Sequence, residues 1–131
     1  MFKLFFDGYC ETNPNDWGKY GVVIYQDDKV IKTISGDIYG QVVSNNVAEY
    51  KGLLAGLKFL LNNNYEHEEI EVYGDSMLVI MQMNGLWRIK KGIYKEVALE
   101  TKNLIKKFTD IVFEWIPREN NTLADELSKP K

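Results

Sequence analysis

The order of strand-like and helix-like segments limits the fold of this chain more than any other feature. Three strand patterns follow one another with only a polar loop and a tight turn between them, at residues 2–8, 21–25 and 30–35. A helical pattern at 47–61 precedes a fourth strand pattern at 70–73, and helical patterns at 76–83 and 93–108 separate that strand from a fifth at 111–116. A short helix ends the chain. Strands that follow closely pair antiparallel, whereas helical crossovers join parallel strands. We therefore predict an α/β domain whose mixed five-stranded sheet has three antiparallel strands, then two parallel ones, flanked by helices.

Length and composition favour one globular domain spanning residues 1–131. The chain is 45% hydrophobic and 27% charged, which is typical of a folded protein. It has no apolar run near the roughly 20 residues of a membrane helix, and its start does not resemble a signal peptide. The single cysteine, Cys10, excludes an intrachain disulfide and agrees with a reducing compartment. We expect a cytoplasmic monomer with no obligatory protein partner and no membrane contact.

The charge of the chain is unevenly distributed. The net charge is -3 and the pI about 5.2, which argues weakly against nucleic acid as a partner. Residues 88–107, however, carry seven Lys and Arg against two Asp and Glu. This basic segment fits either a solvated helix face or a ridge that contacts phosphates.

Four carboxylates stand in settings that suggest a common site. Asp7 and Asp75 each follow a strand pattern, Glu49 lies early in a helical pattern, and Asp125 lies near the C-terminus. Each alone has an ordinary explanation, as a turn, a helix surface residue, a helix cap or a surface acid. Acids gathered at the ends of strands repel one another unless a cation joins them. Together they predict a site for divalent metal.

The ligand types favour magnesium. Mg²⁺ prefers carboxylate oxygens and water, and the chain offers one histidine, His67, and one cysteine, so a zinc site is not expected. Two Mg²⁺ ions roughly 3.5–4 Å apart suit phosphodiester hydrolysis, since they neutralise charge on the phosphoryl oxygens and activate a water. We expect two Mg²⁺ ions, for which Mn²⁺ can substitute.

The ordered motifs around these acids resemble type 1 ribonuclease H, closest to the short form of archaea and many bacteria. The resemblance covers nearly the whole chain. It rests on Phe6-Asp7-Gly8 followed by Asn13-Pro14, on residues 45–50 (Asn-Asn-Val-Ala-Glu-Tyr), on Gly74-Asp75-Ser76, and on residues 115–120 leading to Ala124-Asp125. No single motif is specific, but the ordered set is.

The resemblance implies the RNase H-like fold and hydrolysis of the RNA strand of RNA–DNA hybrids, leaving 5′-phosphate and 3′-hydroxyl ends. It assigns metal binding and catalysis to Asp7, Glu49, Asp75 and Asp125. Asp7 would bridge both ions, Glu49 and Asp75 would hold the ion on the leaving side, and Asp125 the ion that carries the attacking water.

Substrate contacts follow from the same resemblance. Asn13 matches a position that contacts the RNA backbone. Asn45 and Asn46 match a pair that reaches the minor groove, where 2′-hydroxyls distinguish RNA from DNA; Asn45 could also cap the helix, as could Ser44. Trp87 beside Lys90 is our candidate for holding the DNA strand, with core packing of Trp87 as the alternative. Cys10 also falls at a family contact position, although an isolated cysteine is more often a small buried hydrophobe.

The chain departs from the family pattern in three places. The loop before Asp125 lacks the histidine of many members, so we expect Arg118 to replace it at the scissile phosphate, with Glu119 as the second candidate. Met77 stands where the family often has glutamine. The basic insertion of many bacterial members is missing. Two alternatives therefore stay open: a weak or inactive nucleic-acid-binding domain, and a nuclease that also acts on double-stranded RNA.

Overall fold

One mixed sheet forms the centre of the protein, seen in a computed structural model that describes residues 1–11, 17–39 and 43–130. In chain order the elements are β1 (Phe2–Cys10), β2 (Trp17–Gln26), β3 (Lys29–Tyr39), α1 (Asn45–Asn62), β4 (Glu69–Gly74), α2 (Met77–Met83), α3 (Lys95–Ile105), β5 (Asp110–Trp115), a 3₁₀ turn (Arg118–Asn120) and α4 (Thr122–Ser128). The strand order is β3-β2-β1-β4-β5. The first three strands pair antiparallel, while β4 is parallel to β1 and to β5. The predicted fold class is confirmed.

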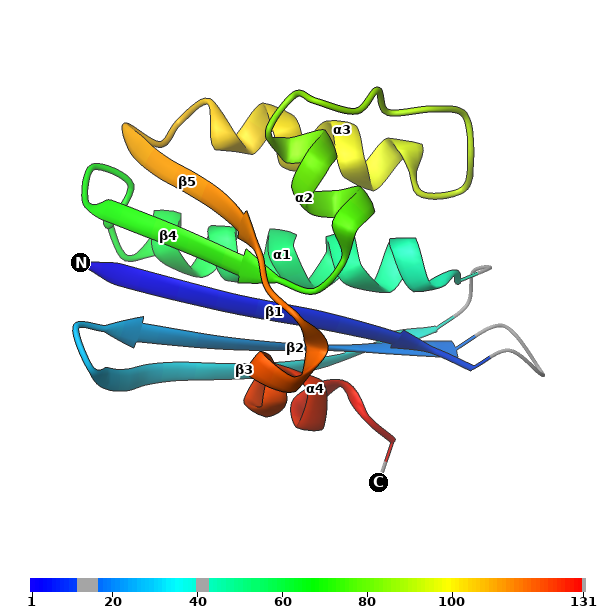
Figure 1. Ribbon diagram of the computed structural model, residues 1–131, viewed down its shortest axis with the longest axis horizontal. Coiled ribbons are helices and arrows are strands. Elements are labelled where there is room, and N and C mark those ends of the chain that lie inside the picture. The colour runs from blue at the N-terminus through cyan, green and yellow to red at the C-terminus, as the bar shows by residue number, and fades with distance from the viewer. Residues whose placement is uncertain (12–16, 40–42, 131) are drawn as a thin grey trace.

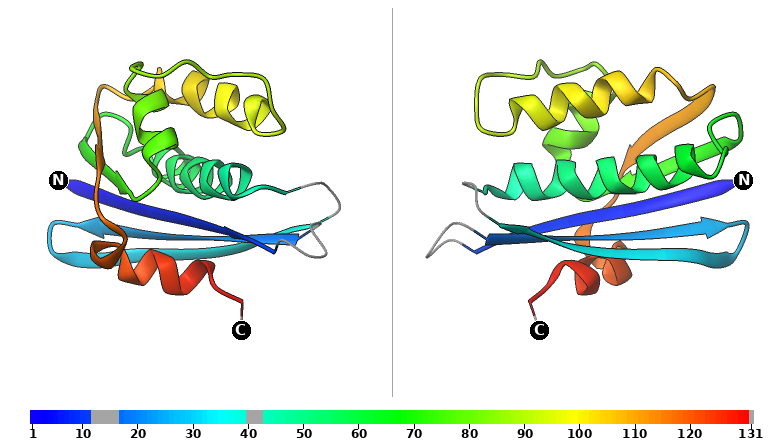
Figure 2. Two further views of the ribbon diagram at one scale, coloured as in Figure 1. Left: turned by 45° about the vertical axis from the view of Figure 1, so that its right-hand side comes forward. Right: turned by 180° about the vertical axis from the view of Figure 1, so that it is seen from behind.

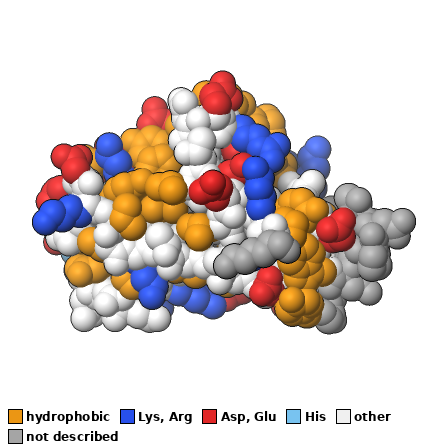
Figure 3. All heavy atoms as spheres, turned by 90° about the horizontal axis from the view of Figure 1, so that it is seen from below, with side chains coloured by type: hydrophobic (Ala, Val, Ile, Leu, Met, Phe, Trp, Pro, Cys, Tyr) orange, Lys and Arg blue, Asp and Glu red, His pale blue; other side chains and the backbone are white. Residues whose placement is uncertain are grey.

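The helices divide unequally between the two faces of the sheet (Figures 1 and 2). Helices α1, α2 and α3 lie on one face, and α4 alone lies on the other. The main core fills the space between the sheet and α1, with buried side chains such as Leu4, Phe6, Leu53, Leu57 and Val72. The face that carries α4 shows hydrophobic groups interspersed with charged ones (Figure 3). Among the described residues, no helix has the length and apolar character needed to cross a membrane.

The strands of the antiparallel part are longer than the sequence pattern predicts. We expected β1 to end at Asp7-Gly8, but the strand continues to Cys10, because β2 pairs with it from Phe2↔Gln26 through to Cys10↔Gly18. The predicted break at Asp7-Gly8 is therefore wrong, and both ends of the predicted loop at 9–18, residues 9–10 and 17–18, belong to strands. β2 and β3 likewise extend beyond 21–25 and 30–35.

The structure shows which of the two candidate residues, Ser44 or Asn45, caps the N-terminus of α1. The side chain of Ser44 accepts a hydrogen bond from the backbone N–H of Val47 at 3.2 Å, so Ser44 is the N-cap and Asn45 is the first helical residue. Helix α3 is shorter than the predicted 93–108. The residues before it, from Asn84 to Tyr94, connect α2 to α3 without forming a helix or strand.

Candidate active site

Asp7 and Asp75 are neighbours because of where the parallel pairing of β1 and β4 ends. The last paired residues are Phe6 and Gly74, and each aspartate directly follows one of them along the chain. β1 continues beyond this point beside β2, whereas the chain after β4 turns into α2. Ser76 caps that helix, its hydroxyl accepting from the backbone N–H of Val79 at 3.3 Å. Asp75 is thus not the cap, and its carboxylate is free of that role.

Gly8 allows Glu49 to join the two aspartates. A Cβ atom at this position would collide with the backbone of Ala48 and Glu49, where α1 crosses β1. Only glycine permits so close an approach of helix and strand. The glycine that looked like part of a turn therefore sets the distance between Asp7 and Glu49.

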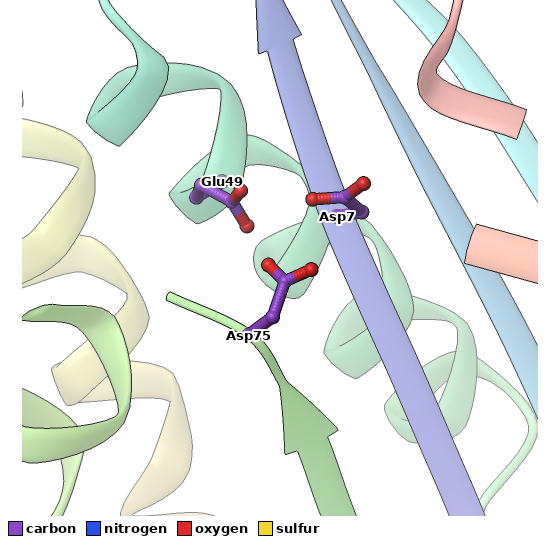
Figure 4. A group of neighbouring side chains, drawn as sticks. All are labelled: Asp7, Glu49 and Asp75. Carbon is purple, nitrogen blue, oxygen red and sulfur yellow. The ribbon is translucent and has the colours of Figure 1, made fainter. Parts of the chain in front are cut away.

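The carboxylates of Asp7, Glu49 and Asp75 point toward one another (Figure 4). One oxygen from each lies within 4.8 Å of the others. Asp7 is 5% exposed and Glu49 8% exposed, and Glu49 Oε2 is buried with no hydrogen-bond partner among the described residues. Two buried acids and a half-buried one, with one unpartnered oxygen among them, are costly alone, and they are an arrangement that a hard cation would stabilise.

The pKa values of these acids reflect the crowding. Burial raises the pKa of Asp7 to about 7, and the nearby Asp125 and Asp75 carboxylates add to the shift although Glu49 opposes it. The pKa of Glu49 lies well above its ordinary value, chiefly through burial and then through the charge of Asp7. Burial also raises the pKa of Asp75, in part offset by the side-chain amide of Asn121 and by Arg118. In the absence of a cation, the centre therefore holds protons to an unusually high pH.

Asp125 approaches from α4 on the other face of the sheet. Gly21, opposite Asp7 in β2, makes this possible, since a Cβ there would collide with the backbone of α4. The three-acid group found among the described residues does not include Asp125. Ser128 links the two parts, with its hydroxyl 3.2 Å from Asp7 Oδ2 and 2.8 Å from the carbonyl oxygen of Asp125.

Two cations neutralise Asp125. Its carboxylate lies 3.3 Å from Arg118 Nη2 and 2.9 Å from Lys129 Nζ. Burial acts to raise the pKa of Asp125, but hydrogen bonds with Lys129 and Asp7 and the charge of Arg118 outweigh it and lower the pKa. Arg118 is 73% exposed in its side chain, so it can leave this pair to meet another anion. Asp125 is hence the one acid of the four whose pKa is lowered, whereas burial raises the pKa values of Asp7, Glu49 and Asp75.

Sequence reasoning missed three residues that support the centre. Asn121 is 1% exposed and donates from Nδ2 to the carbonyl oxygen of Phe6 at 2.9 Å, which ties the start of α4 to β1. Ser128 and Lys129 follow Asp125 by three and four residues on the same helical side, a spacing that could have revealed them. Asn121 gave no such signal, since an asparagine before a helix is usually read as a cap.

A cleft of about 580 Å³ opens over the acids. Besides Asp7, Glu49 and Asp75, its lining includes Cys10, Asn45, Asn46, Trp115 and Arg118. Trp115 also donates from Nε1 to the backbone oxygen of Asp75 at 3.1 Å. The predicted substrate residues Asn45 and Asn46 and the predicted catalytic Arg118 thus lie in the same cleft as the acids.

The other predicted contacts lie elsewhere. Trp87 and Lys90 line a separate hollow of about 520 Å³ between α2 and the segment that connects α2 to α3. Trp87 is 43% exposed, which argues against core packing. Asn13 lies outside the described residues. His67 is exposed and bonded to Thr109 at 2.6 Å, as expected for a surface residue.

These features define a class of protein: an α/β domain with an oxygen-only carboxylate centre suited to divalent cations, set in an open cleft. Comparison with known proteins gives the family. The sequence profile described as "Reverse transcriptase-like" matches residues 5–130. The chain belongs to the type 1 ribonuclease H family, as the motifs predicted.

Three relatives illustrate the match. A bifunctional protein of Mycobacterium tuberculosis is 37% identical over 123 residues, which is 93% of this chain and 33% of that protein. Ribonuclease HI of Halobacterium salinarum is 32% identical over 95% of this chain and 60% of its own length. The structure of LC11-RNase H1 in complex with an RNA/DNA hybrid has a TM-score of 0.84 at 30% identity, covering 98% of this chain and 94% of that one. The chain thus spans about a third of the mycobacterial relative.

Proposed function

We propose that this protein hydrolyses the RNA strand of RNA–DNA hybrids with two Mg²⁺ ions, leaving 5′-phosphate and 3′-hydroxyl ends. The observation that carries the proposal is the convergence of Asp7, Glu49 and Asp75 within 4.8 Å, beneath a cleft, in a chain of the ribonuclease H family. The hybrid bound by LC11-RNase H1 supports the choice of substrate.

The residues present fit a magnesium centre. Every donor is a carboxylate oxygen, and Glu49 Oε2 is buried without a partner. Asp7, Glu49 and Asp75 would hold the metal, with Asp125 completing the set from α4. When bound, Mg²⁺ would neutralise charge on the phosphoryl oxygens and supply an activated water. The chain's own contribution is to keep these acids together although they repel one another.

The other cleft residues suit a nucleic-acid strand. Asn45 and Asn46 stand at the first turn of α1, where amides can reach the minor-groove edge of the RNA. Arg118 would contact the scissile phosphate after leaving Asp125, as a charged group and not as a base, since guanidinium stays protonated. Trp87 and Lys90 would hold the DNA strand in the second hollow.

The alternative of a binding-only domain is less well supported. A module that only binds has no use for buried acids whose pKa values are raised by burial and whose charges repel a phosphate backbone. Such a cluster destabilises the fold unless a cation compensates.

A substrate panel tests the proposal. Labelled RNA–DNA hybrid, single-stranded RNA, double-stranded RNA and double-stranded DNA are incubated with the protein and Mg²⁺, and product ends are identified by phosphatase sensitivity. We expect cleavage of the hybrid RNA strand with phosphate at the 5′ end, and intact double-stranded DNA. Cleavage of double-stranded RNA at the hybrid rate would instead favour the broader nuclease.

The variant Asp75→Asn separates catalysis from binding. We expect it to bind the hybrid and to yield no product, because one carboxylate of the centre is gone while the cleft keeps its shape. Wild-type protein that binds the hybrid without cleaving it would establish the binding-only alternative. Asp110→Asn, which changes an exposed acid at the start of β5, is the matched control and should cleave as the wild type does.

A further inference from the structure

A buried amide in α2 joins α1, the helix that carries Glu49, to the segment that carries Trp87. Gln82, in the last turn of α2, is 0% exposed. Its Oε1 accepts from the Tyr50 hydroxyl at 2.6 Å, and its Nε2 donates to the Arg88 carbonyl oxygen at 3.0 Å and to the Tyr94 hydroxyl at 3.1 Å. A carbonyl can only accept, so the Arg88 contact fixes which side of the amide carries the nitrogen.

The segment from Asn84 to Tyr94, which we call the connector, has few supports of its own. No backbone–backbone hydrogen bond involves residues 88–91 within the part of the chain that the structure describes. The carbonyl oxygen of Arg88 is held by Gln82, and the N–H of Lys90 donates to the Tyr94 hydroxyl at 3.3 Å. The half-buried side chain of Ile89 provides an apolar anchor. The backbone on either side of Ile89 therefore depends on the side chains of Gln82 and Tyr94.

Tyr94, the last residue of the connector, packs against α1. Its ring lies parallel to that of Tyr50 with centroids 6.1 Å apart, and it packs on the small apolar cluster that includes Val47 and Ala48. In Figures 1 and 2 the connector passes above the N-terminal end of α1, the end that bears Asn45 and Glu49. The contacts of Gln82 and Tyr94 thus link Tyr50, which is adjacent to the proposed metal-binding Glu49, to the connector and its exposed side chains.

We propose that Gln82, acting with Tyr94, is a positioning residue that fixes the connector so that Trp87, Arg88 and Lys90 meet the second strand of the hybrid. This inference rests on the proposed function. The exposed cations of the connector attract phosphates wherever the segment moves, but binding in one register needs a fixed backbone. Gln82 touches neither the acids nor the cleft above them, so it acts on substrate affinity and not on the chemical step.

Two variants test this proposal by steady-state kinetics on a short hybrid. Tyr94→Phe keeps the stacked ring and removes both hydroxyl contacts, and Gln82→Met keeps the side-chain length and removes the amide. We expect KM for the hybrid to rise about 5- to 10-fold, the effect of losing one or two buried hydrogen bonds, while kcat stays within about twofold of wild type. A fall in kcat with unchanged KM would overturn the proposal, since it would place the effect at Glu49 through Tyr50.

Limited trypsin digestion provides a readout independent of activity. Cleavage after Arg88, Lys90 and Lys91 should be about tenfold faster in both variants, while cleavage after Lys29 in the β2–β3 hairpin keeps its wild-type rate. Thr101→Val removes a buried hydroxyl that bonds only within α3 and is the matched control; it should alter neither readout. Unchanged connector cleavage together with unchanged KM would refute the role of Gln82. If wild-type protein fails to cleave hybrid, the proposed function fails, yet the digestion still decides whether Gln82 holds the connector.

Discussion

Replacing Asp7 with asparagine is expected to lower kcat for hybrid cleavage by at least about 10³-fold, the scale on which preorganised charge stabilisation acts. Asp7 is the acid that all three others affect: Asp125 and Asp75 raise its pKa, and a hydrogen bond with Glu49 lowers it. An amide of the same size keeps the packing but removes the negative charge that a divalent cation requires. The rate of RNA-strand cleavage at saturating Mg²⁺ measures the loss.

Asp37→Asn is the matched control for this experiment. Asp37 is exposed on β3, two strands from Asp7, and makes no contact with the acid centre. The control should retain the wild-type rate. Activity of Asp7→Asn within tenfold of wild type would contradict the metal-binding role of Asp7.

The stability of the metal-free protein should fall as the pH rises from about 4 to about 7. Burial raises the pKa of Asp7 to about 7 from 3.8, so over this window the native state holds a proton that the unfolded chain has lost. When the native state binds more protons than the unfolded chain, the free energy of unfolding falls as the pH rises. The pKa of Glu49 is also raised, so Glu49 adds to this effect. The loss is roughly 2–4 kcal/mol, the upper value following from 1.36 kcal/mol per pKa unit. Thermal unfolding in EDTA across this range measures it.

Two comparisons isolate the cause of that pH dependence. Mg²⁺ added at pH 8 should raise the Tm of the wild type, whereas NaCl of equal ionic strength should not. Asp7→Asn in EDTA should show a flatter profile and a higher Tm at pH 8, since a repelling charge is gone. Asp125, whose pKa is lowered, acts in the opposite sense and only below about pH 4. A metal-free wild type that gains stability between pH 5 and pH 8 would contradict the assigned shifts.

The element order was predictable because each segment carries its own periodicity. The extent of β1 was not, since Gly8, Tyr9 and Cys10 read as a break and the start of a loop. Their strand conformation comes from pairing with β2, a contact between segments that no local pattern records. Gly8 shows the same limit. Its sequence setting suggests a turn, whereas glycine is needed there because α1, more than forty residues away in sequence, approaches β1 closely.

The metal site was predicted from the sequence settings of the four acids, and the resemblance assigned each acid a role. Their unequal burial and opposite pKa shifts were not predicted. The structure groups Asp7, Glu49 and Asp75 together and sets apart Asp125, which lies on the other face of the sheet and is paired with Arg118 and Lys129. Lys129 is one helical turn from Asp125, so its role was accessible from spacing. The buried roles of Asn121 and Gln82 arise only in three dimensions, because their partners lie in other elements.

Removal and restoration of metal tests the central claim most directly. The rate of RNA-strand cleavage in an RNA–DNA hybrid is measured before EDTA, after EDTA, and after excess Mg²⁺ or Mn²⁺ is returned. We expect cleavage to cease with EDTA and to recover with either cation, because the clustered carboxylates can assist hydrolysis only when a cation joins them. Cleavage that continues undiminished in EDTA would contradict the account.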